Sequence, residues 1–319
     1  MPKFAVPLTA AAALVGGTLT AAVAMPTTGS AAAAAPPAPA PQVVVQTTPM
    51  LAATTTAATT GVSVKHFNYG KHKGNDLDVF APSAVAKAPH GTDLRPAVVL
   101  VHGGSWTHGS KTSMYDAARQ LVGQGYVALP ISYRFAQNSS YPAGREDVQS
   151  AVRWIKKHSD ALHVDPKKIV VLGSSAGGEL AASALTWGNG SRYGIGLISL
   201  SAPMDLALVA ANTTHTGGSA KLARTVTDTL LRCLPFKCGK AFDRDSAAEH
   251  LDHNDPANLL FASTNEWVDN RSTIRFHEAS IGNHVKSDLY LIDGTRHGME
   301  YWDQAWPTIK TWLKQRFGR

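Results

Sequence analysis

Three side chains that can perform acyl transfer together occur in this chain in a suitable order: Ser175, an acidic residue near position 266, and His297. A serine hydroxyl becomes a nucleophile when an imidazole takes its proton and an acid holds that imidazole in the right tautomer. Backbone N–H groups must also face the developing oxyanion. Ser175 is the centre of a G-x-S-x-G sequence, and His297 lies 122 positions downstream (297 minus 175).

The residues around Ser175 predict a sharp turn from a strand into a helix. Residues 169–172 form a short apolar run, which is typical of a parallel strand covered on both faces. A side chain two positions from the apex would collide with the turn, and Gly173 and Gly177 avoid that collision. A bare five-residue motif also occurs in ordinary Gly/Ser turns, so the interpretation depends on the rest of the chain.

A second loop is suited to bind the oxyanion. The apolar run 96–101 predicts a buried strand, and it ends in His102-Gly103-Gly104. We expect the backbone N–H groups of Gly104 and Ser105, together with that of Ala176, to form the oxyanion hole. His102 precedes these donors, and we interpret it as a residue that shapes the loop.

Alternating strands and helices must position these residues. Strands are predicted at 62–67, 77–80, 96–101, 126–133, 169–172, 194–200, 259–261 and 288–292, and helices at 114–122, 143–158, after Ser175, at 271–279 and at the C-terminus. This pattern predicts an α/β fold with a mostly parallel central sheet flanked by helices and with its site at the carboxyl ends of the strands. The pattern breaks at about 205–258, which we interpret as a small helical cap insertion.

Several motifs resemble the esterase/lipase branch of the α/β-hydrolase superfamily, especially hormone-sensitive-lipase-like carboxylesterases and bacterial acetylxylan and feruloyl esterases. The similarity extends from about Phe80 to the C-terminus and is densest over 98–180. It is carried by His102-Gly103-Gly104-Ser105-Trp106, Ile131-Ser132-Tyr133-Arg134, Tyr141-Pro142-Ala143, Glu146-Asp147-Val148, Ala151-Val152-Arg153-Trp154-Ile155 and Gly173-Ser174-Ser175-Ala176-Gly177-Gly178. The resemblance implies the α/β-hydrolase fold and a Ser-His-acid esterase without a metal or organic cofactor.

The chain departs from the family pattern at the acid. Members usually carry H-G-x-x-D-x-x-V-P after the preceding strand, but one residue is missing from this pattern here. Alignment on the strand puts Glu266 at the acid position, and alignment on Val268 puts Asn265 there. We favour Glu266, since the end of the strand places the acid, and Asp205 is a further candidate whose ordinary role is a helix cap.

The N-terminal residues differ in composition from the rest of the 319-residue chain. Residues 1–24 are typical of a secretory signal peptide, and the Ala/Pro/Thr-rich residues 25–61 are typical of a disordered linker. Residues 62–319 then form the α/β-hydrolase domain. We therefore expect a secreted, extracellular protein with no stable membrane anchor. The net charge of +7 is spread along the chain, which does not favour a nucleic-acid partner.

Two cysteines are the only ones in the chain, Cys233 and Cys238. In an exported protein this spacing favours a local disulfide, although a reduced pair is the alternative. The acidic and histidine residues between 243 and 255 match neither a zinc nor a calcium pattern, so we expect no metal site.

These observations predict a secreted serine carboxylesterase whose substrate is a short-chain or polysaccharide-linked carboxylic ester. In this interpretation Ser175 attacks, His297 transfers the proton and Glu266 orients His297. Two alternatives are an amidase or formamidase of the same fold and a catalytically impaired hydrolase-fold binding protein, the latter suggested by the unusual acid segment.

Overall fold

The computed structural model describes residues 43–46, 61–211 and 217–318. The predicted signal peptide lies outside these residues, and so does the predicted linker apart from 43–46 and Gly61. Described residues 43–46 form a short strand, β1 (Val43–Gln46), which pairs in parallel with the last strand of the sheet. The linker prediction did not include this pairing.

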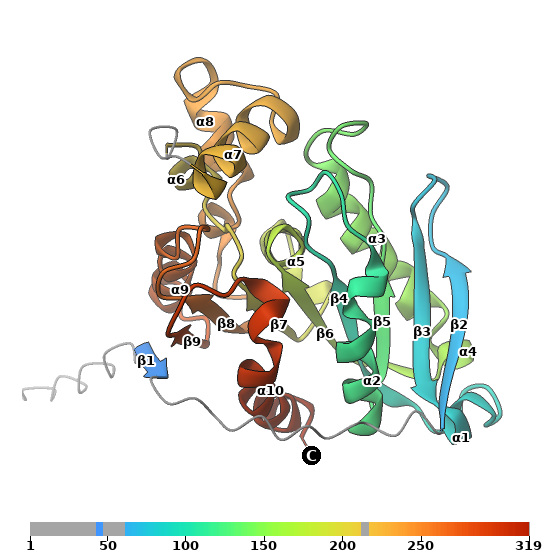
Figure 1. The fold of residues 1–319 in the computed structure, drawn as a ribbon. Helices are drawn as coiled ribbons and strands as arrows, with labels where there is room; N and C mark the ends of the chain where they lie inside the picture. The colour runs from blue at the N-terminus through green and yellow to red at the C-terminus, as the bar shows by residue number, and fades with distance from the viewer. Residues whose placement is uncertain (1–42, 47–60, 212–216, 319) are drawn as a thin grey trace, which may run out of the picture. The chain divides into compact units, whose positions relative to one another are not determined.

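One nine-stranded sheet runs through the described part of the chain, in the order β1-β9-β8-β7-β6-β4-β5-β3-β2 (Figure 1). All neighbouring strands from β1 to β5 are parallel, whereas β3 pairs antiparallel with both β5 and β2. The prediction of a mostly parallel sheet is therefore confirmed. Its remaining strands are β2 (Val62–Asn68), β3 (Asp76–Pro82), β4 (Arg95–Val101), β5 (Val127–Ile131), β6 (Val164–Ser174), β7 (Gly196–Leu200), β8 (Ala257–Ser263) and β9 (Ser287–Ile292).

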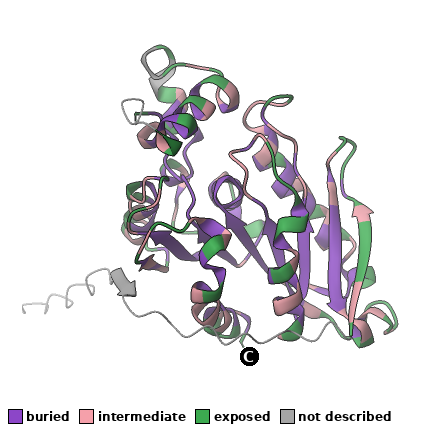
Figure 2. Ribbon diagram, in the orientation of Figure 1, coloured by how far each residue is buried: buried purple, intermediate pink, exposed green. Residues whose placement is uncertain are grey.

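The central strands are apolar on both faces because helices cover both faces (Figure 2). Along β4, Val99 and Val101 join one hydrophobic core, and Val98 and Leu100 join the other. The first core includes side chains of α3 (Ala143–Lys157), α5 (Ala176–Thr186) and α9 (Arg271–Gly282). The second includes side chains of α2 (Tyr115–Gly123) and α10 (Trp302–Phe317). This layering fixes the strand ends that carry the predicted site.

Short helices fill the connections outside the layers. They are α1 (Ser83–Ala86), η1 (Lys111–Met114), α4 (Ser159–Leu162), η2 (Gly190–Arg192) and η6 (Gly298–Tyr301).

The segment between β7 and β8 is helical and leaves the sheet undisturbed. It contains α6 (Leu206–Ala211), α7 (Gly218–Arg224), the π-helix η4 (Thr225–Leu230), α8 (Pro235–Asp245) and η5 (Ala247–His250). The two strands that flank it are nevertheless direct neighbours, since Leu197 pairs with Asn258 and Leu200 with Phe261. The insertion touches the body of the domain where the N–H of Tyr141 donates to Leu230 O at 3.0 Å.

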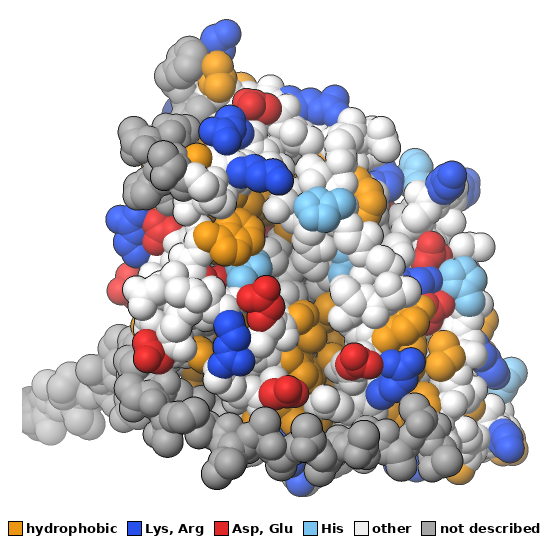
Figure 3. Space-filling view, viewed as in Figure 1, with side chains coloured by type: hydrophobic (Ala, Val, Ile, Leu, Met, Phe, Trp, Pro, Cys, Tyr) orange, Lys and Arg blue, Asp and Glu red, His pale blue; other side chains and the backbone are white. Residues whose placement is uncertain are grey.

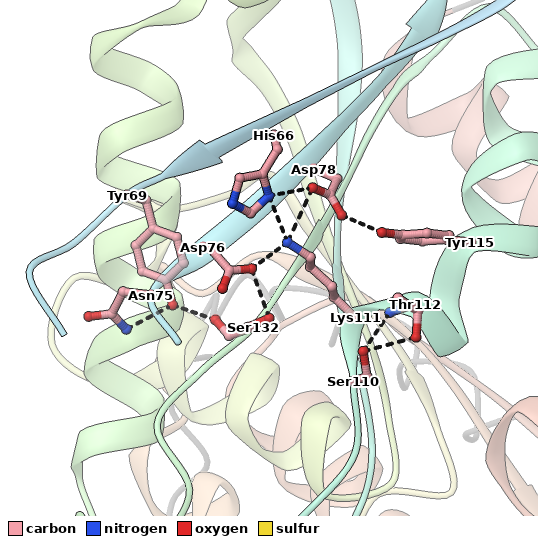
Figure 4. A network of polar contacts seen from close by, with 10 residues as sticks. All are labelled: His66, Tyr69, Asn75, Asp76, Asp78, Ser110, Lys111, Thr112, Tyr115 and Ser132. Carbon is pink, nitrogen blue, oxygen red and sulfur yellow. Dashed lines mark hydrogen bonds and ion pairs between the residues drawn. The ribbon is translucent and has the colours of Figure 1, made fainter. Parts of the chain in front are cut away.

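A buried lysine ties the antiparallel strands to the segment that follows the predicted oxyanion loop (Figure 4). Lys111 Nζ forms ion pairs with Asp76 and, at 3.2 Å, with Asp78, and both carboxylates come from β3. Asp78 also accepts hydrogen bonds from His66 at 2.8 Å and Tyr115 at 2.5 Å. These contacts hold η1 on the sheet and so fix the C-terminal end of the loop that begins at His102.

Candidate active site

The turn at Ser175 has the strained geometry that the glycine spacing predicts. Ser175 lies between β6 and α5 with φ 54° and ψ −128°, a conformation that non-glycine residues rarely adopt. A Cβ on Gly177 would lie 2.3 Å from the carbonyl oxygens of Val101 and His102. The Ser175 N–H donates to Leu200 O at 2.8 Å, which anchors the apex to β7. The serine is therefore held at the end of β6 beside the end of β4.

Glu266 and His297 lie together after the neighbouring strands β8 and β9. His297 Nδ1 and Glu266 Oε2 are 2.5 Å apart, and the Glu266 side chain is 1% exposed. The other oxygen of Glu266 accepts from Ser263 N at 2.8 Å and from Ser201 Oγ at 2.9 Å. Because the Glu266 carboxylate can only accept a hydrogen bond, the ring hydrogen of neutral His297 must lie on Nδ1. Nε2 then keeps its lone pair.

The other acid candidates lie elsewhere. The Asn265 amide donates to Thr264 Oγ1 at 3.2 Å, whereas His297 Nδ1 is bonded to Glu266. Asp205 forms an ion pair with Arg275 at 2.5 Å and accepts the N–H of Leu208 at 2.9 Å. The latter bond is a cap on α6, so the structure gives Asp205 the helix-capping role.

The histidine loop packs directly on the serine turn. A Cβ on Gly298, the residue after His297, would lie 2.4 Å from Ser174 Oγ, and Ser174 is the residue before Ser175. Gly298 N–H also donates to Ser201 Oγ at 2.9 Å. His297 Nε2 is buried and has no hydrogen-bond partner among the described residues. An imidazole nitrogen with an available lone pair is therefore held next to the serine turn.

The loop after β4 faces the same serine. A Cβ on Gly103 would lie 3.1 Å from Ser175 Cβ, and the loop continues through Ser105 and Trp106, which both have positive φ (47° and 59°). No described residue accepts a hydrogen bond from the backbone N–H of Gly104, Ser105 or Ala176. The backbone donors predicted from the sequence are thus available for a ligand oxygen.

His102 shapes this loop, as its position suggested. Its Nδ1 lies 2.7 Å from Gly103 O, and its ring stacks on Tyr133 at 4.5 Å between centroids. Burial lowers the pKa of His102, which favours the neutral ring.

Sequence reasoning missed two residues of this region, Ser201 and Glu179. Ser201, at the end of β7, connects the Glu266 carboxylate with the backbone of Gly298 and with Tyr301 Oη at 2.7 Å. Glu179 is fully buried in α5, and it accepts the indole N–H of Trp106 at 2.8 Å. A single charged side chain in the small, apolar stretch 176–186 was the signal that could have identified Glu179.

The two tryptophans near the site differ in exposure. Trp267 is 36% exposed, and its ring lies 4.4 Å from that of His297. Trp106 is 1% exposed and packs inside the domain.

No group of three or more His, Cys, Asp or Glu residues in the described ranges could hold a metal ion, and no helix in these ranges is both long and apolar enough to cross a bilayer. On the face shown in Figure 3, basic side chains are interspersed with acidic ones.

The side chain of Cys238 lies outside the described residues, so its pairing with Cys233 stays a prediction.

Comparison with known families gives a match over most of the domain. The family described as BD-FAE matches residues 77–279, more than half of the chain. Esterase LipC of Mycobacterium tuberculosis is 34% identical over 126 residues, which are 39% of this chain and 30% of that protein. The aligned part therefore spans about a third of the relative's length.

Solved structures share the fold over a larger part of the chain. A truncated carbohydrate esterase from gut microbiota superposes with a TM-score of 0.69 at 18% identity, covering 82% of this chain and 98% of that one. An acetyl ester-xyloside bifunctional hydrolase from Caldicellulosiruptor lactoaceticus gives 0.64 at 18% identity, covering 80% and 96%. Together with the family match, these similarities confirm the α/β-hydrolase fold and the resemblance to its esterase branch.

Proposed function

The chain belongs to the BD-FAE family, and from its site geometry we propose that it is a serine carboxylesterase that acts through an acyl-enzyme. The observation that carries this proposal is the Glu266–His297 hydrogen bond, which leaves a buried, unpartnered Nε2 beside the strained turn at Ser175. Such an arrangement of acid, imidazole and serine performs acyl transfer on several unrelated folds.

Each step follows from the placement of these groups. Ser175 Oγ attacks the ester carbonyl while His297 Nε2 takes its proton, and the Glu266 carboxylate stabilises the imidazolium that forms. The N–H groups of Gly104, Ser105 and Ala176 donate to the oxyanion. Collapse of the tetrahedral intermediate breaks the C–O bond, and the imidazolium protonates the leaving alcohol. A water molecule then attacks the acyl-enzyme with His297 again as base, which releases the acid and restores Ser175.

The proposed substrates are short-chain esters or acyl groups carried by a polysaccharide. Two structural neighbours support this choice by their names, a carbohydrate esterase and an acetyl ester-xyloside hydrolase. The exposed ring of Trp267 beside His297 offers an apolar surface for the alcohol or acyl part of a substrate.

The decisive experiment compares the purified protein with its Ser175→Ala variant on p-nitrophenyl acetate. We expect turnover that depends on Ser175. Equal hydrolysis by both proteins would refute the proposal and favour the binding-protein alternative. A panel of acetyl, butyryl and feruloyl esters, acetylated xylan and the matching amides then separates short-chain from polysaccharide esterase and from amidase or formamidase.

We also propose that the protein is exported by residues 1–24 and acts outside the cell, with Cys233 and Cys238 joined in a disulfide. The composition of residues 1–24 supports export, and the close spacing of the two cysteines supports the bond. N-terminal sequencing of protein from the culture medium tests the first, and a mass increase of about 2 Da on reduction tests the second.

A further inference from the structure

A buried carboxyl group that the proposed mechanism does not use connects the serine helix to the oxyanion loop. Glu179 lies one helical turn after Ser175, and its backbone N–H donates to Ser175 O at 3.1 Å. Its side chain is 0% exposed. One oxygen accepts from Trp106 Nε1 at 2.8 Å, and the other accepts from Ser183 Oγ at 2.6 Å.

The charged and titratable groups facing Glu179 come from other elements. Arg145 of α3 favours the ionised carboxylate, whereas Asp245 of α8 disfavours it. The guanidinium of Arg145 stacks 4.0 Å over the Trp187 ring, and its Nε and Nη1 have no hydrogen-bond partner among the described residues. Tyr133 and Tyr141, whose pKa values burial raises, are also close enough to feel the charge of Glu179.

Burial is the main cause of an unusual proton affinity at Glu179. It raises the pKa of Glu179 to about 7, against the lowering effect of Ser183, Trp106 and Arg145. The carboxyl group therefore changes charge in the pH range in which a serine esterase works.

The partner of Glu179 belongs to a strained part of the oxyanion loop. Ser105 and Trp106 are consecutive non-glycine residues with φ of 47° and 59°. Such conformations persist only where surrounding contacts hold them. Three contacts hold Trp106: its indole is packed inside the domain, the indole N–H donates to Glu179, and its backbone carbonyl accepts the N–H of Ala136 at 2.8 Å.

We infer that Glu179 is a positioning residue: its ionised carboxylate holds Trp106, and through Trp106 it holds the loop N–H groups of Gly104 and Ser105 in the geometry that binds the oxyanion. This inference rests on the proposed esterase function. A hydrogen bond to a carboxylate is roughly twice as strong as one to a neutral acceptor. Protonation of Glu179 thus loosens the loop without moving Ser175, His297 or Glu266.

The test divides the kcat of the full-length wild type by the kcat of Glu179→Gln, both measured on p-nitrophenyl acetate from pH 5.5 to 8.5. Glutamine keeps the shape of the side chain and an acceptor for Trp106, but it stays neutral. We expect a ratio near 1 at low pH that rises to about 10 at high pH with a midpoint near 7, while KM changes little. Any pH effect that both proteins share cancels in the ratio.

Two further variants separate positioning from simple packing. In a Trp106→Phe background, Glu179→Gln is expected to cause no further loss, because the interaction is already gone. Ser183→Ala removes the bond to the other oxygen and keeps the one to Trp106. Ser183→Ala should keep the wild-type kcat at high pH. Because Ser183 lowers the pKa of Glu179, its loss should move the midpoint of the pH dependence of kcat to higher pH.

A measurement independent of turnover distinguishes the two proposals. The indole N–H resonance that disappears in Trp106→Phe should titrate in the ¹⁵N-labelled wild type with a midpoint near 7, and it should not titrate in Glu179→Gln. Serine-dependent turnover with a pH-independent ratio and a non-titrating indole would overturn the role of Glu179. A titrating indole in a protein without serine-dependent turnover would refute the esterase function instead.

Discussion

Replacement of Glu266 by glutamine should reduce turnover far more than the small change in shape suggests. The carboxylate has three donors around it in the structure: His297, Ser201 and the backbone N–H of Ser263. A glutamine must keep its carbonyl oxygen toward Ser201 and Ser263, since both of these are donors. Its NH₂ group then faces His297 Nδ1, which has to act as an acceptor.

This orientation selects the wrong tautomer of His297. The ring hydrogen moves to Nε2, so the nitrogen beside Ser175 no longer accepts a proton. The corresponding acid-to-amide change in a serine protease lowers kcat by about 10⁴. We expect a loss of about 10³ to 10⁴ in kcat/KM for Glu266→Gln, which is about 4 to 5.5 kcal/mol of transition-state stabilisation.

The assay compares kcat/KM on p-nitrophenyl acetate at pH 8 for Glu266→Gln, Asn265→Ala and Asp205→Asn, with Tm measured in parallel. Asn265→Ala should keep activity, because among the described residues its side-chain amide donates to Thr264 and not to His297. Asp205→Asn should lower Tm through the lost ion pair with Arg275. Less than a tenfold loss in Glu266→Gln, or a larger loss in Asn265→Ala, would refute this account of the acid.

Three further variants test how the fold supports the site. Gly177→Ala should abolish activity and lower the yield of folded protein, because its Cβ would lie 2.3 Å from two carbonyl oxygens of the 101–102 segment; activity and circular dichroism check this. Asp147→Asn should lower Tm by about 6 °C at a cost of about 3 kcal/mol, since the mostly buried Arg134 guanidinium loses its close charged partner at 2.8 Å and keeps the more distant Glu146 at 3.9 Å. Glu179→Gln should raise Tm at pH 8 but not at pH 4. The folded state binds the Glu179 proton more tightly than the unfolded state, so stability falls as pH rises from about 4.5 to about 7, by roughly 3 kcal/mol in all. Equal Tm differences at the two pH values would contradict this sign.

The serine turn and the mostly parallel direction of the strands were predictable because they depend on local patterns. Apolar runs mark the ends of β4 and β6. Gly173 is required by contacts with residues 177 and 178 of the same turn, whereas Gly177 is also required by the close approach of the carbonyl oxygens of residues 101 and 102. The parallel order of the strands follows from their alternation with helices.

The acid was less predictable because its place depends on where a turn begins. The sequence alone allows Glu266 or Asn265, according to whether the strand or Val268 is used as the anchor. In the structure β8 ends at Ser263, and its N–H bonds directly to Glu266, so the strand end sets the position. A contact between residues 263 and 266 leaves no periodic signal.

The role of Glu179 could not be predicted because its partner is 73 positions away in sequence. From the sequence, Trp106 is only part of the loop motif that follows His102. In the structure it is buried and donates to a carboxylate. Pairings between distant residues of unlike type depend on tertiary packing, and the same holds for Ser201 with Glu266 and for β1 with β9.

The insertion between β7 and β8 has a consequence for how such a protein can diversify. It leaves and re-enters the sheet at strands that are direct neighbours, and the acid follows β8 regardless of how long the excursion is. Selection can lengthen, shorten or exchange these helices while Glu266 and His297 keep their positions relative to each other. The helical insertion and the proton-transfer groups are then separable units, and a laboratory can test this by grafting a helical segment from a relative between β7 and β8.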